Sequence, residues 1–462
     1  MEIVLKPFKL GNQYYVYDRN TNKILAVPKQ DYEVLCSNQS STEKNAVLKK
    51  YQSKGFFLEN RLTEIKHPAN DFVTQFEEEN VTQLILQVTQ DCNLRCSYCY
   101  YVNESYRNRH HAKLNMSGDT ARKAMDYLLS HSVGKDNITL GFYGGEPLLR
   151  MDILKYCIEY MESQVQDRRI LFTLTTNGTL LTDDIIEYFI AHNVALFISL
   201  DGTKETHDRN RKFVNGHGSF DIVMWNVAHI KERYPEYFKT IYFNTVISPE
   251  MDMKCVRDYY SADEVLATAN FTSSTIQEFY TDDPPQYDDR LYIDSQYGEF
   301  KALLICAGRL SAKDMPFIYQ GDISDIRKLQ ENLHTDFLLP SAYHHGGPCI
   351  AGSRRLFVDV AGNFYPCERV SESSETMKIG SLEEGLNLEK VLNLINVGKI
   401  TENECKRCWA LVHCRICAAW ADNLTGLDKS KKLQACPLYK SSVLHRFKNV
   451  CALSQFTHHK IK

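Results

Sequence analysis

Three cysteines with short, fixed spacing carry the strongest chemical signal in the sequence. Cys92, Cys96 and Cys99 follow one another as C-x3-C-x2-C, directly after the apolar run Leu84–Thr89. Three thiolates on one loop fit one iron-sulfur cluster, and because a cubane has four irons, one iron stays open to chelate a small molecule. Structural zinc is the alternative, but it takes four ligands, usually as two pairs, and no second pair lies near this loop. The spacing therefore predicts a cluster that binds a small molecule.

The aromatic Tyr98 before the last cysteine completes a loop that resembles the cluster loop of radical S-adenosylmethionine (SAM) enzymes. The resemblance implies that the open iron binds the amino and carboxylate groups of SAM. An electron from the reduced cluster would then cleave the sulfonium and release a 5′-deoxyadenosyl radical, which removes a hydrogen from the substrate. Because the cofactor carries this chemistry, the protein supplies position and exclusion of water.

Strands and helices alternate from Val81 onward, which predicts parallel βα units of the α/β class. Ser117 is expected to cap the first helix, and a later helix is expected over Phe220–Arg233. Six repeats make a partial barrel, the radical SAM barrel by resemblance, and the chemistry of such folds lies at the carboxyl ends of the strands. After the strand that precedes the cysteine loop, the predicted strands are Ile138–Phe142, Ile170–Thr175, Ala195–Leu200, Thr240–Ile247 and Ala269–Ser273.

Polar and glycine-rich turns follow these strands in the order in which the family places its SAM contacts. The glycines of the turn Gly144–Pro147 let the backbone approach a ligand closely, and the resemblance assigns this turn to the methionyl ammonium. It assigns Ser199 to the ribose or carboxylate, Arg211 to the carboxylate as a fork-shaped cation, and the segment 244–246 to adenosine. An ordinary turn or surface charge is the alternative for each position alone. The implied SAM-binding residues are Gly144, Gly145, Glu146, Pro147, Asn177, Ser199, Asp201, Arg211, Asn244 and Val246.

Seven further cysteines lie between residues 349 and 436, in a pattern that resembles the SPASM extension of radical enzymes acting on peptides and proteins. That extension holds two auxiliary four-iron clusters. A hairpin of Leu356–Val360 and Phe364–Pro366 would bring the first two of these cysteines together. The resemblance implies an inner cluster on Cys349, Cys367 and Cys417, and an outer cluster on Cys405, Cys408, Cys414 and Cys436.

Two departures from the family pattern affect these clusters. Cys414 and Cys417 are separated by two residues where the family has three, so their allocation between the clusters stays open. No cysteine follows shortly after Cys349, which predicts an open iron in the inner cluster that would bind a substrate thiolate. Cys306 or Cys451 could instead close that site. A zinc ribbon is the other interpretation of the two CxxC pairs.

Four further residues have a predicted role or location. Glu368 directly follows Cys367, where sulfatase-maturing relatives place an acidic base, and a surface carboxylate is the alternative. Cys36, Cys157 and Cys255 stand in apolar or helical contexts and are expected in the core.

The chain divides into five segments by pattern. Residues 1–75 read as a small β-then-α domain that resembles the winged-helix-like leader-recognition element of peptide-modifying enzymes, with a merely structural cap as the alternative. Its predicted strands and helices are Lys6–Leu10, Gln13–Asp18, Lys23–Val27, Gln30–Cys36 and Thr42–Ser53, and a polar linker is expected over Asn60–Glu79. The barrel then covers 80–275, a connector 276–345, the SPASM domain 346–440 and a tail 441–462.

Composition narrows the classes of function. A chain of 462 residues with 43% hydrophobic residues can fill about three domains. A net charge of −4 with scattered basic residues argues against nucleic acid as a partner, and no apolar run approaches a membrane span. Without an export signal at the start, 15 cysteines indicate metal ligation in a cytoplasmic protein.

The function predicted by the resemblance is a peptide maturase with SAM and three [4Fe-4S] clusters. It would form thioethers, of the sactipeptide or ranthipeptide kind, from cysteine to a residue carbon in a ribosomally made precursor with a leader. A flavodoxin- or ferredoxin-type reductant would be its partner. The alternatives are carbon-carbon crosslinking, oxidation of a sulfatase cysteine or serine, and, in a different class, a zinc-binding regulatory protein. The sequence leaves open the precursor, the carbon attacked, the number of links and the oligomeric state.

Overall fold

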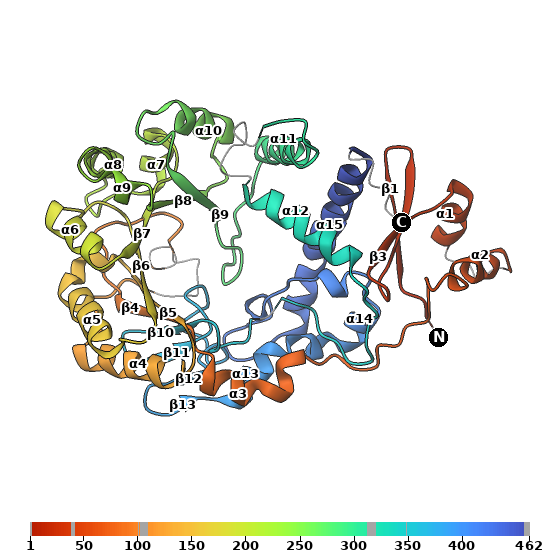
Figure 1. Cartoon of the computed structure of the whole chain (residues 1–462), viewed down its shortest axis with the longest axis horizontal. Coiled ribbons are helices and arrows are strands. Elements are labelled where there is room, and N and C mark those ends of the chain that lie inside the picture. Colours follow the sequence, from red (N-terminus) through yellow and green to blue (C-terminus); the bar gives the residue numbers. More distant parts are fainter. Residues whose placement is uncertain are drawn as a thin grey trace.

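The computed structural model of the chain describes residues 2–37, 42–99, 101, 110–311, 320–347 and 349–456. A three-stranded antiparallel sheet near the N-terminus and a ten-stranded mixed sheet form its framework. Figure 1 shows the small sheet at one end of the molecule and the curved large sheet at the other, with the long helix α15 (Lys429–Phe456) on the side of the small sheet.

The N-terminal elements lie where the sequence predicts them. They are β1 (Leu5–Leu10), β2 (Gln13–Asp18), β3 (Lys23–Ala26), α1 (Lys29–Cys36) and α2 (Thr42–Gln52). Alternate side chains of a strand point to opposite faces, so the sheet has two apolar faces. On one face Val16 and Leu25 pack with Leu35 of α1. On the other, the rings of Tyr17 and Phe447 of α15 lie 4.5 Å apart, so the small sheet is held against the C-terminal helix.

Six parallel strands form the barrel part of the large sheet, as predicted. They are β4 (Gln83–Thr89), β5 (Asn137–Gly144), β6 (Arg169–Thr176), β7 (Val194–Ser199), β8 (Tyr242–Ile247) and β9 (Asn270–Thr275). The outer face is covered by α4 (Gly118–Ser130), α5 (Met151–Gln164), α6 (Asp183–Ala191), α7 (Lys204–Asn210), α8 (Phe220–Arg233), α9 (Pro235–Phe238) and α10 (Met253–Ala262) (Figure 1). Ser117 caps α4 as expected, because its hydroxyl accepts from the Thr120 N–H at 3.0 Å.

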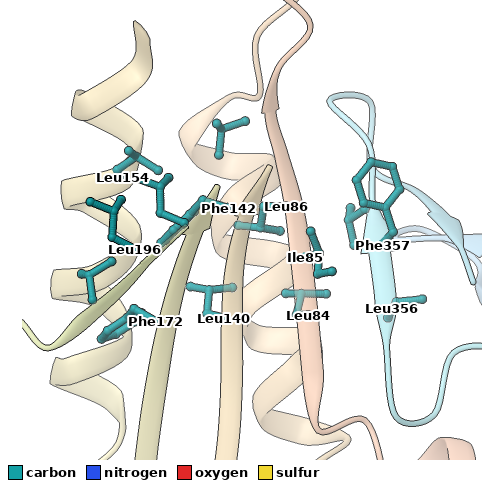
Figure 2. Close-up of a cluster of buried hydrophobic side chains, with 14 of the residues drawn as sticks. Leu84, Ile85, Leu86, Leu140, Phe142, Leu154, Phe172, Leu196, Leu356 and Phe357 are labelled. Carbon is teal, nitrogen blue, oxygen red and sulfur yellow. The ribbon is translucent and has the colours of Figure 1, made fainter. Parts of the chain in front are cut away.

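Side chains that alternate along the strands fill the barrel core. Leu84 and Leu86 of β4, Leu140 and Phe142 of β5, and Leu154 of α5 belong to one buried apolar cluster between the sheet and the helical layer (Figure 2). All five are buried to 2% exposure or less. Burial of this apolar surface is the main stabilising contribution to the α/β layer.

The C-terminal region extends the barrel sheet. The predicted hairpin forms as β10 (Leu356–Val358) and β11 (Asn363–Tyr365), followed by β12 (Gly380–Ser381) and β13 (Gly385–Leu386). β10 pairs in parallel with β4, with Leu356 opposite Leu84, so barrel and C-terminal domain share one sheet and one core (Figure 2). Helices α13 (Leu388–Ile395) and α14 (Glu402–Lys406) follow, and α15 continues without a break across the predicted boundary at residue 440.

The structure corrects the predictions for the linker and for two cysteines, and it shows the helices of the connector. The linker predicted over Asn60–Glu79 is wrong in its second half, where a 3-10 turn (Pro68–Phe72) and α3 (Val73–Glu79) form. The connector contains two helices, α11 (Asp289–Cys306) and α12 (Gln320–His334). Cys157 is buried as predicted, but Cys36 and Cys255 are exposed.

In the described ranges, no helix is both long enough and apolar enough to span a bilayer.

Candidate active site at the strand ends

A cavity of about 440 Å³ opens at the carboxyl ends of the barrel strands. The loop of three cysteines, turns after four strands and the start of the C-terminal domain all contribute to its wall. The predicted residues that line it are Cys92, Cys96, Cys99, Gly144, Gly145, Asn177, Ser199, Arg211, Asn244, Val246 and Glu368. Positions far apart in sequence therefore converge on one space, as parallel strands with a common edge require.

The two glycines after β5 seat the cysteine loop. The Gly145 N–H donates to the Thr89 carbonyl at 2.9 Å, and the Glu146 N–H to the Asp91 carbonyl at 2.8 Å. A Cβ on Gly145 would lie 1.9 Å from the Asp91 oxygen, and one on Gly144, whose φ is +134°, would lie 2.2 Å from the Thr89 oxygen. Glycine is needed here because two backbones touch, whereas the sequence analysis attributed it to the approach of a ligand.

Glu146 acts behind the cavity wall. Its buried carboxylate accepts from the Thr176 hydroxyl at 2.7 Å, from the Asn177 N–H at 2.7 Å and from the Leu148 N–H at 3.0 Å. These bonds tie the turn after β5 to the end of β6. Pro147 is buried as well, so the side chains of both residues support the wall.

Asp201 is the second buried carboxylate behind the wall. It accepts from Arg211 Nε at 2.9 Å, from the Val246 N–H at 2.9 Å and from the Tyr98 hydroxyl. The end of β7, the end of α7, β8 and the cysteine loop are thereby joined at one fully buried group. Arg211 Nη1 lies 4.0 Å from Cys96 Sγ, so the guanidinium reaches the cavity while Asp201 holds it.

Polar contacts fix the rest of the loop. Asn177 Nδ2 lies 2.8 Å from Asn93 Oδ1 and 3.8 Å from Cys92 Sγ. The Ser97 hydroxyl donates to Asn210 Oδ1 at 2.6 Å. The loop is therefore anchored to the strand-end turns on one side and to the end of α7 on the other.

His207 supports this arrangement as a buried neutral base. Its Nδ1 accepts from the Asp201 N–H at 3.3 Å, and its Nε2 lies 3.0 Å from the Ser219 hydroxyl. Burial lowers the pKa of His207 from 6.5 to about 4, with the positive charge of Arg211 adding to the effect.

The depressed pKa of His207 makes stability depend on pH. Between its ordinary value of 6.5 and about 4, the unfolded chain binds a proton that the folded chain rejects, so stability falls as pH drops through this window. We expect the free energy of unfolding to fall by about 2 kcal/mol between pH 7 and pH 5 because of this residue. Urea unfolding of the wild type and of His207→Gln at both pH values measures the difference, since the other histidines titrate in both proteins. Parallel pH profiles would contradict the prediction.

The three thiols have the chemistry of cluster ligands. Burial raises the pKa of Cys92 and of Cys96 to about 12, so metal must displace their protons on binding. In the described part of the chain, no three His, Cys, Asp or Glu side chains gather closely enough to hold a single metal ion. A cluster takes each thiolate at a different iron, so its ligands stand farther apart than those of zinc. The donor set on the cavity wall fits such a cluster.

Electrostatic contacts between the C-terminal cysteines define two neighbourhoods. Burial raises the pKa of Cys367 to about 12, with Glu368, Cys417 and Cys349 adding to the rise. The second neighbourhood is separate: burial raises the pKa of Cys414 to about 12 with Cys408 and Cys405 adding to it, and Cys405 likewise acts on Cys436.

The two cysteines considered as a further ligand lie in other surroundings. Cys451 is buried in the apolar cluster of β1, β2 and α15, and Cys306 packs against the same cluster. Cys367 and Cys417 instead pack against the barrel core.

Glu368 lines the cavity and is held by an arginine that the sequence did not single out. Arg355 Nη1 lies 3.1 Å and 3.3 Å from the two carboxylate oxygens of Glu368. Tyr101, Arg369 and the segment Thr272–Gln277 also belong to the cavity wall, although no motif in the sequence marks them. The position of that segment at the end of the last barrel strand was a usable signal, because the same rule found the turns after the earlier strands.

Comparisons with known proteins agree with this geometry. The family described as "Radical SAM superfamily" matches residues 86–261. The cysteine-type anaerobic sulfatase-maturating enzyme of Clostridium novyi is 31% identical over 34% of this chain and 42% of its own length. The radical SAM cyclopropyl synthase TigE of Paramaledivibacter caminithermalis is 22% identical over 89% of this chain and 84% of its own. The chain thus spans less than half of the sulfatase-maturating relatives that it matches.

Among solved structures, "Native anSMEcpe with bound AdoMet" superposes with a TM-score of 0.57 at 18% identity, covering 82% of this chain and 99% of that one. This likeness extends the shared fold beyond the barrel. Residues 86–261, which hold the cysteine loop and most of the wall of the strand-end cavity, match the radical SAM family.

Proposed function

We propose that the enzyme is a peptide maturase that links a cysteine sulfur to a residue carbon in a ribosomally made precursor peptide. The proposal is supported by the cavity that the barrel and the C-terminal domain line together. Its wall joins the cysteine loop and the strand-end turns to Glu368 and Arg369 of the C-terminal domain, so a substrate would lie between the SAM side and that domain. Relatives named as sulfatase-maturating enzymes, and the similar fold of "Native anSMEcpe with bound AdoMet and Cp18Cys peptide", support a peptide as the substrate class.

The cofactor set of the proposal is SAM with three [4Fe-4S] clusters. When bound, these groups supply a 5′-deoxyadenosyl radical that takes one hydrogen atom from the peptide, and iron centres that accept the electron left behind. Cys92, Cys96 and Cys99 would hold the first cluster. Arg211 would bind the SAM carboxylate, and Ser199 the ribose or carboxylate. The turn at Gly144 and Gly145 would receive the ammonium, and Asn244 and Val246 the adenosine.

The C-terminal cysteines support thioether formation within this scheme. Cys349, Cys367 and Cys417 would bind the inner cluster, and Cys405, Cys408, Cys414 and Cys436 the outer one. Cys349 and Cys417 both act on the Cys367 thiol, whereas Cys306 and Cys451 pack in a different apolar cluster, and this supports an open iron in the inner cluster. A substrate thiolate is the soft ligand that such a position prefers.

Two partners complete the proposal. The small N-terminal sheet with its two helices would bind the leader of the precursor, since this β-then-α unit resembles a leader-recognition element. A flavodoxin- or ferredoxin-type protein would supply electrons.

Glu368 is proposed as the base that takes the second hydrogen as a proton. We expect Glu368→Gln to lower product formation by roughly 10²–10⁴-fold, because general-base catalysis is worth that much, while SAM cleavage continues. The amide keeps a hydrogen-bond acceptor for Arg355, so the fold is preserved. Glu375→Gln, at an exposed carboxylate of the same segment, is the control. Unchanged turnover in Glu368→Gln would remove this residue from the mechanism.

The experiment that tests the proposal is an anaerobic reaction of the iron-reconstituted enzyme, SAM and dithionite with the short cysteine-containing peptide encoded beside its gene. Tandem mass spectrometry before and after thiol alkylation reads the product. Loss of two hydrogens per link, with a cysteine that no longer alkylates, is the expected result. SAM cleavage with an unchanged peptide would reject the substrate class.

Carbon-carbon bond formation is the second candidate. The cyclopropyl synthase aligns over 89% of this chain, far more than the sulfatase-maturating relatives do, and a cyclopropyl ring closes through carbon-carbon bonds. The same measurement separates the two, because hydrogen loss with every thiol still free indicates carbon-carbon linkage. Oxidation of a sulfatase cysteine or serine would show as an aldehyde. If the protein were colourless and free of iron after anaerobic purification, that result would instead support a zinc-binding regulatory protein.

A further inference from the structure

Lys432 is a fully buried lysine beside the outer group of cysteines. It lies in the first turn of α15 and is 1% exposed. Its Nζ donates to the Thr401 hydroxyl at 2.6 Å and lies 3.6 Å from Cys405 Sγ. The Thr401 hydroxyl in turn lies 3.2 Å from the same sulfur. An ammonium group and a hydroxyl therefore converge on Cys405.

No carboxylate balances the charge of Lys432. Across the described residues, no Asp or Glu oxygen lies within the 4.0 Å limit of an ion pair with its Nζ. Glu404, the acidic neighbour whose pKa Lys432 helps to lower, pairs with Lys429 at 2.7 Å. A buried cation without a counter-charge is strongly destabilising, because burial removes its hydration. Another negative group must therefore offset it.

Besides the Thr401 hydroxyl, His344, His345 and the paired Glu404, the groups that face Lys432 are cysteine sulfurs. The charge of Lys432 acts on Cys414 and Cys436, and its Nζ lies 3.6 Å from Cys405 Sγ. The Cys436 thiol donates to the backbone carbonyl oxygen of Lys432 at 3.5 Å. Thiols are neutral, but thiolates bound to a four-iron cluster carry negative charge on the sulfurs that Lys432 faces. The position of this lysine is thus explained by an anionic cluster on these cysteines.

We propose that Lys432 is the buried counter-charge of the outer cluster and that it raises the reduction potential of that cluster. Reduction adds one negative charge to the cluster, and a fixed positive charge a few ångströms away in a low-dielectric site stabilises the reduced form. Hydrogen bonds to the cluster sulfurs act in the same direction. The outer cluster would then be an electron acceptor of this enzyme. The inference rests on the outer cluster assigned under the proposed function.

The test is a redox titration of the full-length protein monitored by electron paramagnetic resonance. A background with Cys92, Cys96 and Cys99 changed to alanine leaves only the auxiliary clusters, and the signal lost on adding Cys405→Ser and Cys408→Ser belongs to the outer one. We expect Lys432→Met to reduce the equilibrium constant for reduction of this cluster at least tenfold, which lowers its potential by about 59 mV. Lys432→Arg keeps the charge and is expected to keep most of the potential.

Lys440→Gln is the matched control. Lys440 lies on the same helix and also faces Cys408 and Cys436, but it is exposed, so water screens its charge and a smaller shift is expected. A Lys432→Met protein that loses the outer cluster while Lys432→Arg retains it also supports the counter-charge. If both lose it, or if the shift in Lys432→Met does not exceed that in Lys440→Gln, the proposal for Lys432 is overturned alone. If the serine substitutions remove neither signal nor iron, the outer cluster is wrong and the proposal falls with it.

Discussion

Replacing Cys96 with alanine is expected to remove about four irons per chain and to lower SAM cleavage at least about a thousandfold. Cys96 Sγ is a central group of the cavity wall, in electrostatic contact with Cys99 and Arg211. Without its thiolate the first cluster has two protein ligands left, which do not hold a cubane. Iron analysis and detection of 5′-deoxyadenosine after anaerobic reconstitution measure the two losses.

Cys255→Ala is the matched control for this substitution. Cys255 is an exposed cysteine of α10, and its change is expected to leave iron and SAM cleavage unaltered. Full iron content together with wild-type SAM cleavage in Cys96→Ala would refute the assignment of the cysteine loop. Loss of iron in both variants would point to a general effect of cysteine substitution on reconstitution.

Neutralising Asp201 is expected to give the largest loss of stability in the molecule. Asp201→Asn leaves the buried Arg211 guanidinium without its counter-charge, and breaking a buried pair in this way costs roughly 3–5 kcal/mol. Asp201 is completely buried and Arg211 is 7% exposed, so water cannot replace the lost partner. Urea unfolding at pH 7 measures the change in the free energy of unfolding.

An exposed ion pair nearby provides the comparison. Asp221 pairs with Lys204 at 2.5 Å, but its side chain is 75% exposed, and Asp221→Asn is expected to leave the free energy of unfolding nearly unchanged because water screens the pair. If the two substitutions lowered the free energy of unfolding equally, burial would not explain the contribution of Asp201 to stability. Affinity for SAM is expected to fall in Asp201→Asn alone, because Arg211 then loses its orientation towards the cavity.

Local patterns in the sequence predict most of the site. The spacing of Cys92, Cys96 and Cys99 follows from the cluster that they would bind, and the turns after the strands meet because parallel strands end at one edge. This is why Asn177 and Asn244, separated in the chain, line the same cavity. The order of the barrel strands follows from the alternation of strands and helices for the same reason.

What the sequence did not predict depends on contacts between distant segments. Glu146 and Asp201 were assigned to SAM by motif, yet their carboxylates turn away from the cavity to satisfy backbone N–H groups of neighbouring turns. Arg355 reaches Glu368 because the antiparallel register of β10 and β11 brings these two positions to the same end of the hairpin. Polar residues hid the helix Val73–Glu79, since its two buried positions are Val73 and the acidic Glu77, which give little apolar periodicity. Lys432 carries no local signal at all.

The parallel pairing of β10 with β4 has a consequence for how the protein is made. β4 is an interior strand of the finished sheet, but its partner Leu356–Val358 is translated long after it. Until then one side of β4 presents unpaired N–H and C=O groups, the kind of edge on which nascent chains associate wrongly. Formation of the complete sheet therefore waits until the segment Leu356–Val358 has left the ribosome.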